Sequence, residues 1–194
     1  MKKTIAMVMI ATAMTAGTVS AQASRANAAG MTRATVMVGG QSMLPTRDIV
    51  DNAVNSADHT TLVAAVKAAD LAQTLKGRGP FTVFAPVNDA FENLPEGTVA
   101  TLLRPENKAA LAKVLTYHVV PGRHTAADLM RMIRQGNGTA TLRTASGGTL
   151  TAMMNGPMND TLRDESGNVA SISTYDVLQS NGVIHVINKV LLPR

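Results

Sequence analysis

The sequence of 194 residues contains no cysteine and no tryptophan, and these absences exclude several classes of protein. Without cysteine there can be no disulfide bond, no thiolate metal site and no cysteine nucleophile. Aromatic residues make up only 3% of the chain, so it has few of the stacking side chains that single-stranded nucleic-acid sites use. Hydrophobic residues make up 45%, among them 12 methionines, which predicts an aliphatic, methionine-rich core.

The sequence motifs of common catalytic and nucleotide-binding sites are also missing. There is no His-Glu-x-x-His pair, no Gly-x-Ser-x-Gly turn and no glycine-rich phosphate loop. The acidic residues Asp160, Asp164 and Glu165 lack the glycine and the final glutamate of a calcium-binding loop. We expect that the protein is not an enzyme and needs no metal or cofactor. A hydrolase whose Asp and His groups meet only in the folded chain stays an alternative.

The amino terminus has the pattern of a secretory signal peptide. Lys2 and Lys3 give a positive start, residues 5–16 form an apolar run, and Ala21-Gln22-Ala23 supplies a small-x-small cleavage pattern. A membrane anchor is the alternative, but the apolar run is too short to span a bilayer comfortably. We expect residues 1–23 to be removed as a signal peptide. The mature protein is then secreted or periplasmic, with no stable membrane anchor.

The positive charge of the chain is small and dispersed. Without Lys2 and Lys3, 16 basic and 13 acidic side chains remain. A nucleic-acid binding protein would concentrate its positive charge on one helix or stripe. We therefore expect no nucleic-acid partner, while weak attraction to acidic polysaccharide or anionic lipid is compatible with this charge.

The mature chain is predicted to have two parts. Residues 24–45 are rich in Ala, Gly, Thr and Ser and have mixed polarity, so we interpret them as a flexible leader. Regular hydrophobic patterning begins after them and continues to the end, which predicts a single domain over residues 46–194.

The first half of the domain has the apolar spacing of helices. In the longest predicted helix, which Pro105 opens, Leu111, Leu115 and His118 share one face, so His118 is expected to point into the core. Asp89 followed by Glu92 has the spacing of a capping box. Further helices are predicted to begin near residues 48, 60, 70, 89 and 126, and a short strand is predicted over residues 81–84.

Caps are also expected from two short polar segments. Asp58 or Thr60 precedes the apolar residues of the second predicted helix and is the expected cap of that helix. Asn88 lies at the turn before Asp89, and we interpret it as a turn or cap residue instead of a contact residue.

The second half of the domain has the patterning of strands. Residues 139–144 and 149–153 alternate polar and apolar around a Ser-Gly-Gly turn, and residues 161–163 and 169–173 do so around a second turn. Two nearly continuous apolar strands, expected to be buried on both faces, are predicted over 183–187 and 190–192. Helices followed by strands predict an α+β domain.

Three segments of the domain resemble the signature blocks of the fasciclin domain family. They occur in family order over residues 81–91 (FTVFAPVNDAF), 117–122 (YHVVPG) and 181–193 (NGVIHVINKVLLP). The resemblance covers about residues 46–194. It implies a wedge-shaped β-sandwich with several helices packed along it, display outside the cell, and a non-catalytic role in cell adhesion or matrix interaction. The implied partner is a cell-surface or matrix protein or polysaccharide.

The resemblance also implies a set of partner-binding residues. In animal matrix members, cell binding has been assigned to a Tyr-His segment and to an Asp-Ile-Leu or Asp-Ile-Met tripeptide before the closing block. The matching residues here are Tyr117, His118, Asp176, Val177 and Leu178, with Val177 in place of isoleucine. Each also has a structural interpretation. Tyr117, Val177 and Leu178 can be core residues, His118 a buried hydrogen-bonding group, and Asp176 a cap.

A second possible function is carriage of an apolar small molecule such as a carotenoid or lipid. The resemblance to some fasciclin-like proteins implies this role. Flexible methionine side chains can line an adaptable groove. Five of them are candidates for this lining: Met130, Met132, Met153, Met154 and Met158.

Overall fold

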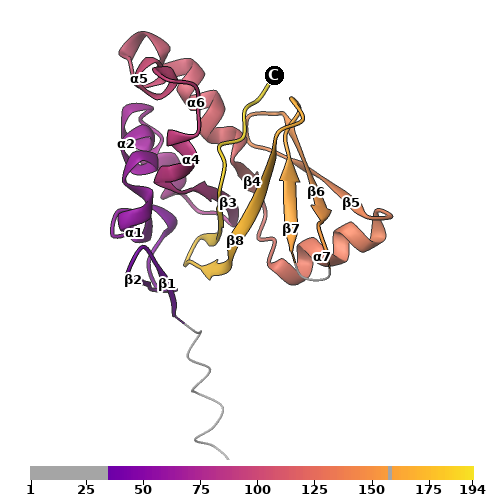
Figure 1. Cartoon of the computed structure of the whole chain (residues 1–194). Coiled ribbons are helices and arrows are strands. Elements are labelled where there is room, and N and C mark those ends of the chain that lie inside the picture. Colours follow the sequence, from indigo (N-terminus) through magenta and orange to yellow (C-terminus); the bar gives the residue numbers. More distant parts are fainter. Residues whose placement is uncertain (1–34, 157–158) are drawn as a thin grey trace, which may run out of the picture. The chain divides into compact units, whose positions relative to one another are not determined.

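The computed structural model describes residues 35–156 and 159–194 (Figure 1). The expected signal peptide, residues 24–34 of the expected leader, and Met158 lie outside these residues. None of the helices in the two described ranges is both long and apolar enough to cross a membrane.

Seven strands form one mixed sheet in the order β4-β3-β9-β8-β7-β6-β5. All neighbours are antiparallel except β3 and β9, which run parallel with Phe81 opposite Gly182. The sheet curls so that its two edge strands approach, and the Val119 carbonyl accepts a hydrogen bond of 2.7 Å from Ala145 N. The strands are β3 (Phe81–Pro86), β4 (Val119–Pro121), β5 (Thr139–Arg143), β6 (Thr149–Met154), β7 (Asp160–Arg163), β8 (Val169–Leu178) and β9 (Gly182–Ile187).

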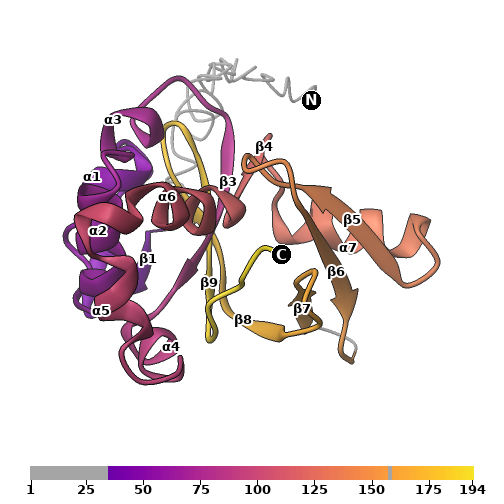
Figure 2. The same cartoon turned by 90° about the horizontal axis from the view of Figure 1, so that it is seen from above.

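The helices lie in two groups (Figure 2). The first group covers β3 and β9, whereas α7 packs against β5 and β6 at the other end of the sheet. The helices are α1 (Ile49–Ala53), α2 (Thr60–Ala68), α3 (Ala72–Leu75), α4 (Asn88–Glu92), α5 (Thr98–Leu102), α6 (Lys108–Tyr117) and α7 (Ala126–Gln135), with 3-10 turns at Ala57–His59 and Pro105–Asn107.

Two hydrophobic cores lie on the two faces of β3 and β9. Val83 and Ala85 pack with the helices of the first group, whereas Phe84 between them packs with the α7 side of the sheet. This alternation follows from the period of two residues along a strand. A helical layer in the first half and a strand-rich second half confirm the predicted α+β class.

A short hairpin lies inside the segment that we expected to be a flexible leader. Strands β1 (Val36–Val38) and β2 (Gln41–Met43) pair antiparallel, and the side chains of Val38 and Met43 are buried in the first core. The expected leader boundary at residue 45 is therefore corrected: the folded part includes residues 36–43, because burial of these two side chains attaches the hairpin.

The helix caps differ from those expected. Neither Asp58 nor Thr60 caps α2 with its side chain; the Asn88 amide oxygen accepts from Thr61 N (3.0 Å) and from the Thr60 hydroxyl (3.1 Å). The interpretation of Asn88 as a cap is correct, but the helix it caps is 28 residues away in sequence. The predicted box at Asp89 is wrong, because α4 already begins at Asn88 and places Asp89 inside its first turn.

The predicted hairpins are present, and the last predicted strand is not. β5 pairs with β6 and β7 pairs with β8, as the alternating patterns predicted. β9 is buried along its whole length. Val190 and Leu191 are also buried, but residues 190–192 form no strand, because the backbone there bonds to side chains instead of to a neighbouring strand.

The side chain of Asn181 joins the helical layer to the start of β9. Its amide oxygen accepts from Ile49 N (3.1 Å), and its amide nitrogen donates to the carbonyls of Leu75 (2.8 Å) and Gly77 (3.2 Å). Three backbone groups from α1 and from the end of α3 are thus satisfied by one side chain, in a partly buried position.

We expect Asn181→Ala to lower the free energy of unfolding by about 2 kcal/mol or more, because it leaves partly buried backbone groups without partners. The matched control is Asn188→Ala, which removes one exposed hydrogen bond to Ser171 N and should cost less than about 1 kcal/mol. Urea unfolding of both variants measures the difference. Equal stability losses would contradict the role assigned to Asn181.

Candidate functional site

Tyr117 is fully buried at the end of α6, in the second core. Its hydroxyl donates to the Thr149 carbonyl (2.6 Å) and accepts from Glu165 N (3.1 Å). Burial raises the pKa of this hydroxyl above its usual value. The side chain thus ties α6 to the start of β6 and to the turn after β7, and it presents no surface to a partner.

His118 follows Tyr117 directly and is also buried. Its Nδ1 lies 2.8 Å from the Val114 carbonyl, and its Nε2 accepts a hydrogen bond of 3.0 Å from Leu191 N. Since Nε2 accepts, the ring is neutral with its proton on Nδ1. Burial lowers the pKa of His118 to about 4, which favours this neutral form. The predicted core position of His118 is confirmed.

The turn between β7 and β8 holds the carboxyl-terminal segment in place. The Asp164 carboxylate accepts from Leu192 N (3.0 Å) as well as from Ser166 N (2.9 Å) and Asn168 N (2.8 Å) of its own turn. The sequence showed only that the acidic cluster is no calcium loop. No local sequence pattern indicates that Asp164 bonds to a residue 28 positions further along the chain.

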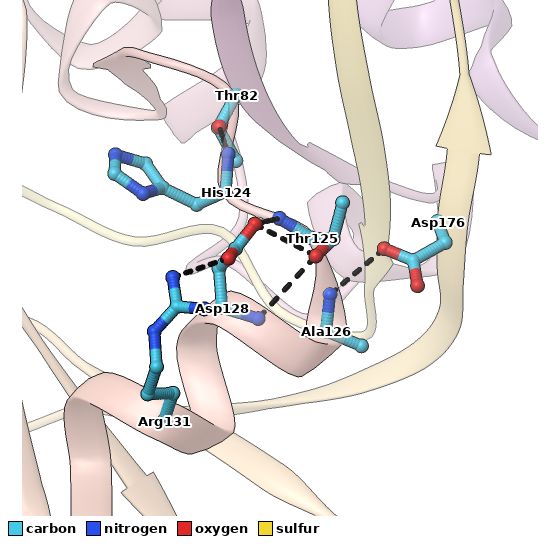
Figure 3. A network of polar contacts seen from close by, with 7 residues as sticks. All are labelled: Thr82, His124, Thr125, Ala126, Asp128, Arg131 and Asp176. Atoms are coloured by element: carbon cyan, nitrogen blue, oxygen red, sulfur yellow. Dashed lines mark hydrogen bonds and ion pairs between the residues drawn. The ribbon is translucent and has the colours of Figure 1, made fainter.

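Asp176, Val177 and Leu178 end strand β8. The Asp176 carboxylate accepts a hydrogen bond of 2.8 Å from Ala126 N at the start of α7 (Figure 3). Its backbone has φ +54°, a left-handed conformation in which Asp is among the better tolerated residues. Val177 is buried in the first core, whereas Asp176 and Leu178 are partly exposed.

The start of α7 carries a capping box that the sequence reasoning missed. The Thr125 hydroxyl accepts from Asp128 N (3.3 Å), and the Asp128 carboxylate accepts from Thr125 N (3.0 Å), so each residue satisfies the other (Figure 3). Together with Asp176, these side chains accept hydrogen bonds from three amides at the start of the helix, those of Thr125, Ala126 and Asp128. The Thr-x-x-Asp spacing was the available signal, with Asp where Glu or Gln is usual.

His185 connects this region to the centre of the sheet. Its Nε2 lies 2.8 Å from the His124 carbonyl and must donate to it, while its Nδ1 accepts from Asp176 N (3.4 Å). The ring stacks on Phe84 with centroids 5.7 Å apart. Since Nδ1 accepts, this ring is also neutral, and burial lowers the pKa of His185 in the same sense. Neither ring has a nitrogen left for acid–base chemistry.

The five residues implied by the resemblance therefore fall into two places. Tyr117 and His118 are adjacent and buried, whereas Asp176 faces the start of α7 and Val177 packs into the other core. They form no single surface patch. Among residues 35–156 and 159–194, no group of three or more His, Asp or Glu side chains is placed to hold a metal ion.

The family model of the fasciclin domain matches residues 57–193. The chain belongs to the fasciclin domain family. Its three signature blocks contribute the three neighbouring strands β4, β3 and β9, so residues far apart in the sequence meet at one side of the sheet. The match to the family model confirms the predicted family, and the element order together with the solved structure described below confirms the predicted fold class.

Relatives of this fasciclin domain occur in bacteria and animals. It is 46% identical over 147 residues to Protein sll1483 of Synechocystis sp., which covers 75% of this chain and 73% of the relative. It is 33% identical to the transforming growth factor-beta-induced protein ig-h3 of Sus scrofa, covering 68% of this chain but 17% of that protein.

A solved structure shares the fold of this fasciclin domain. It is a FAS1 domain pair from the insect cell adhesion molecule Fasciclin I, with a TM-score of 0.67 and 18% sequence identity. The match covers 77% of this chain and 52% of the solved chain, so this fasciclin domain spans about half of that pair.

Because His118 has a pKa of about 4 in the folded domain and 6.5 in its usual state, the folded domain favours its unprotonated form. Its stabilising contribution is present above pH 6.5 and falls by about 1.4 kcal/mol per pH unit as the pH drops towards 4. We expect urea unfolding to show this slope. His118→Gln, which does not titrate, should be less stable at pH 7 but should have a shallower slope.

The control for this experiment is Tyr117→Phe. It removes the neighbouring hydrogen bonds without removing a group that titrates between pH 4 and 7, so it should lower stability at every pH and keep the parent slope. If His118→Gln kept the parent slope as well, the burial of a neutral His118 would not account for the acid sensitivity.

Proposed function

We propose that this fasciclin domain is an exported, non-catalytic module that binds a cell surface or extracellular matrix. The observation that carries the proposal is the state of its two signature histidines: both are buried, and both ring nitrogens of each bond to the protein's own backbone. Groups occupied in this way serve the fold and not a reaction. A solved protein with this fold is described as a cell adhesion molecule, which supports the same role here.

Within this proposal, the five residues have different tasks. Tyr117, His118 and Val177 are buried, so we assign them to supporting the fold. Asp176 and Leu178 retain solvent exposure, and only one carboxylate oxygen of Asp176 has a hydrogen-bond partner in the described part of the chain. We therefore place direct partner contact, where this segment makes any, at Asp176 and Leu178.

Attachment assays test the proposal. The purified chain should bind to the surface of the producing cells or to their extracellular polymer, and deletion of the gene should change attachment or biofilm formation. Absence of binding to every extracellular fraction, together with unchanged attachment, would contradict it.

Asp176→Asn separates partner recognition from capping. Asn also caps helix starts and tolerates positive φ, so the variant should unfold within about 1 kcal/mol of the parent. If the carboxylate meets a partner, the lost charge should weaken attachment about tenfold. The control is Glu92→Gln, which removes an exposed carboxylate on α4. Equal attachment of both variants and the parent would leave Asp176 with the capping role alone.

A second candidate function is carriage of an apolar small molecule, and one cavity favours it. A cavity of about 60 Å³ lies between α1, α2, α6 and the strands β3 and β9, with a lining that is almost wholly apolar. It is not formed by the methionines expected to line a groove. Sites for drug-sized ligands have volumes of about 300–1,000 Å³, so the helices would have to move apart to admit a carotenoid or a lipid.

Mass spectrometry of organic extracts of the natively purified chain tests this candidate. A stoichiometric pigment or lipid would support it. Extracts identical to those of a boiled control protein would contradict it.

A further inference from the structure

A groove of about 730 Å³ lies at the side of the sheet where α3 leads into β3. Residues 76–80, residues 180–182 and Arg123 line most of it, and Asp48 completes the lining. Apart from Asp48, which precedes α1, and Gly182, the first residue of β9, these residues come from three connections: the one between α3 and β3, the one between β8 and β9, and the one between β4 and α7. No aromatic side chain and no large aliphatic side chain takes part.

The charges in the groove are mainly positive. Three cationic side chains, Lys76, Arg78 and Arg123, face a single lining carboxylate, Asp48. Lys76 is in an ion pair of 2.5 Å with Asp51 outside the lining. Neither arginine has a carboxylate partner among residues 35–156 and 159–194. The groove therefore holds two guanidinium groups that form no ion pair within the described structure.

Arg123 is held in position by the protein itself. Its Nη2 donates to the carbonyls of Gln179 (2.8 Å) and Gly182 (3.1 Å), at the two ends of the β8–β9 connection. The N–H groups of Nε and Nη1 make no hydrogen bond within the described ranges. A guanidinium fixed in this way loses little conformational entropy when it binds a ligand.

The backbone of the α3–β3 connection also has donors without partners in the described residues. The amides of Arg78 and Gly79 donate no hydrogen bond within the part of the chain that the structure describes. At Gly79 the connection passes so close to the Asn181 carbonyl that an added Cβ would overlap it, so this position requires glycine. Neighbouring free amides and guanidinium groups are the donors that bind carboxylates, sulfates and phosphates.

We propose that this groove binds the acidic groups of an extracellular polysaccharide. The proposal gives the adhesion module a class of partner, and in that respect it rests on the proposed function. Arg78 and Arg123 would pair with carboxylate or sulfate groups, and the amides of the α3–β3 connection would add hydrogen bonds.

The size and lining of the groove favour this class of ligand. A volume of about 730 Å³ is far larger than one inorganic anion needs and lies in the range of sites for molecules with several rings. Lipid chains and helical peptides need an apolar lining, and peptides that bind by β-augmentation pair with a free strand edge. The groove offers neither, because it is built from connections rich in polar residues, glycine and proline.

Binding of the purified full chain to immobilised polygalacturonate, dextran sulfate, neutral dextran and poly-glutamate tests the proposal, at several salt concentrations. Arg78→Ala is the main variant, since Arg78 is exposed and without a partner in the described structure, so its loss should leave stability unchanged. Arg143→Ala on β5 is the control, because it removes the same charge from an exposed residue that does not line the groove.

We expect binding to one of the two anionic polysaccharides but not to neutral dextran, weakened about tenfold by Arg78→Ala and less than twofold by Arg143→Ala. Equal weakening by both substitutions would show attraction to net charge only and would overturn the proposal. Equally tight, Arg78-dependent binding of poly-glutamate would also overturn it, because the partner would then be an acidic protein segment.

Attachment of the same preparations to cells separates the two proposals. Attachment without any binding to the anionic polysaccharides would overturn the groove as a polysaccharide site and leave the adhesion module supported. Arg78-dependent polysaccharide binding without attachment would support the site and contradict the adhesive role.

Discussion

The neutral ring of His118 joins two backbone groups that are far apart in the sequence, and much of the structure depends on this bridge. Its Nδ1 binds the Val114 carbonyl in the last turn of α6, and its Nε2 holds Leu191 N. The adjacent Tyr117 hydroxyl bonds to Thr149 and Glu165. Two consecutive side chains therefore fasten one helix end to the sheet and to the carboxyl-terminal segment. Both rings are buried, and protein groups satisfy their polar atoms, as a low-dielectric interior requires.

The same principle explains why the family signature lies where it does. The three blocks contribute the adjacent strands β4, β3 and β9 (Figure 2). Polar side chains of these blocks bond to backbone groups of other segments. His118 binds the carboxyl-terminal segment, His185 binds the connection before α7, and Asn181 binds α1 and the end of α3. A fold fixed by a few such contacts accords with the insect domain pair, which keeps a TM-score of 0.67 at 18% identity.

The sequence predicted those features that depend on local patterns. Apolar spacing correctly indicated the helices, the two hairpins and the burial of His118, and the blocks indicated the fold. The missed features depend on partners that no local pattern specifies. Asn88 caps a helix 28 residues earlier, and Leu192 N bonds to Asp164 where the apolar run over residues 190–192 predicted a strand. The hairpin at residues 36–43 was missed because only two of its side chains are buried in the core. The groove could not be predicted, because its three connections become neighbours only through the parallel pairing of β3 and β9.

Residues that serve the fold and residues free for recognition are not two separate sets in this domain. Asp176 uses one carboxylate oxygen to cap α7, and Arg123 uses one nitrogen to hold the β8–β9 connection; each has further polar atoms without partners in the described ranges. A side chain anchored at one atom presents its remaining atoms in a fixed direction, so binding costs little additional entropy. Gly79 passes close to Asn181, and the neighbouring Arg78 lines the same groove as the anchored Arg123. In a chain with few aromatic residues, anchored polar groups of this kind can supply the specificity that stacking supplies elsewhere.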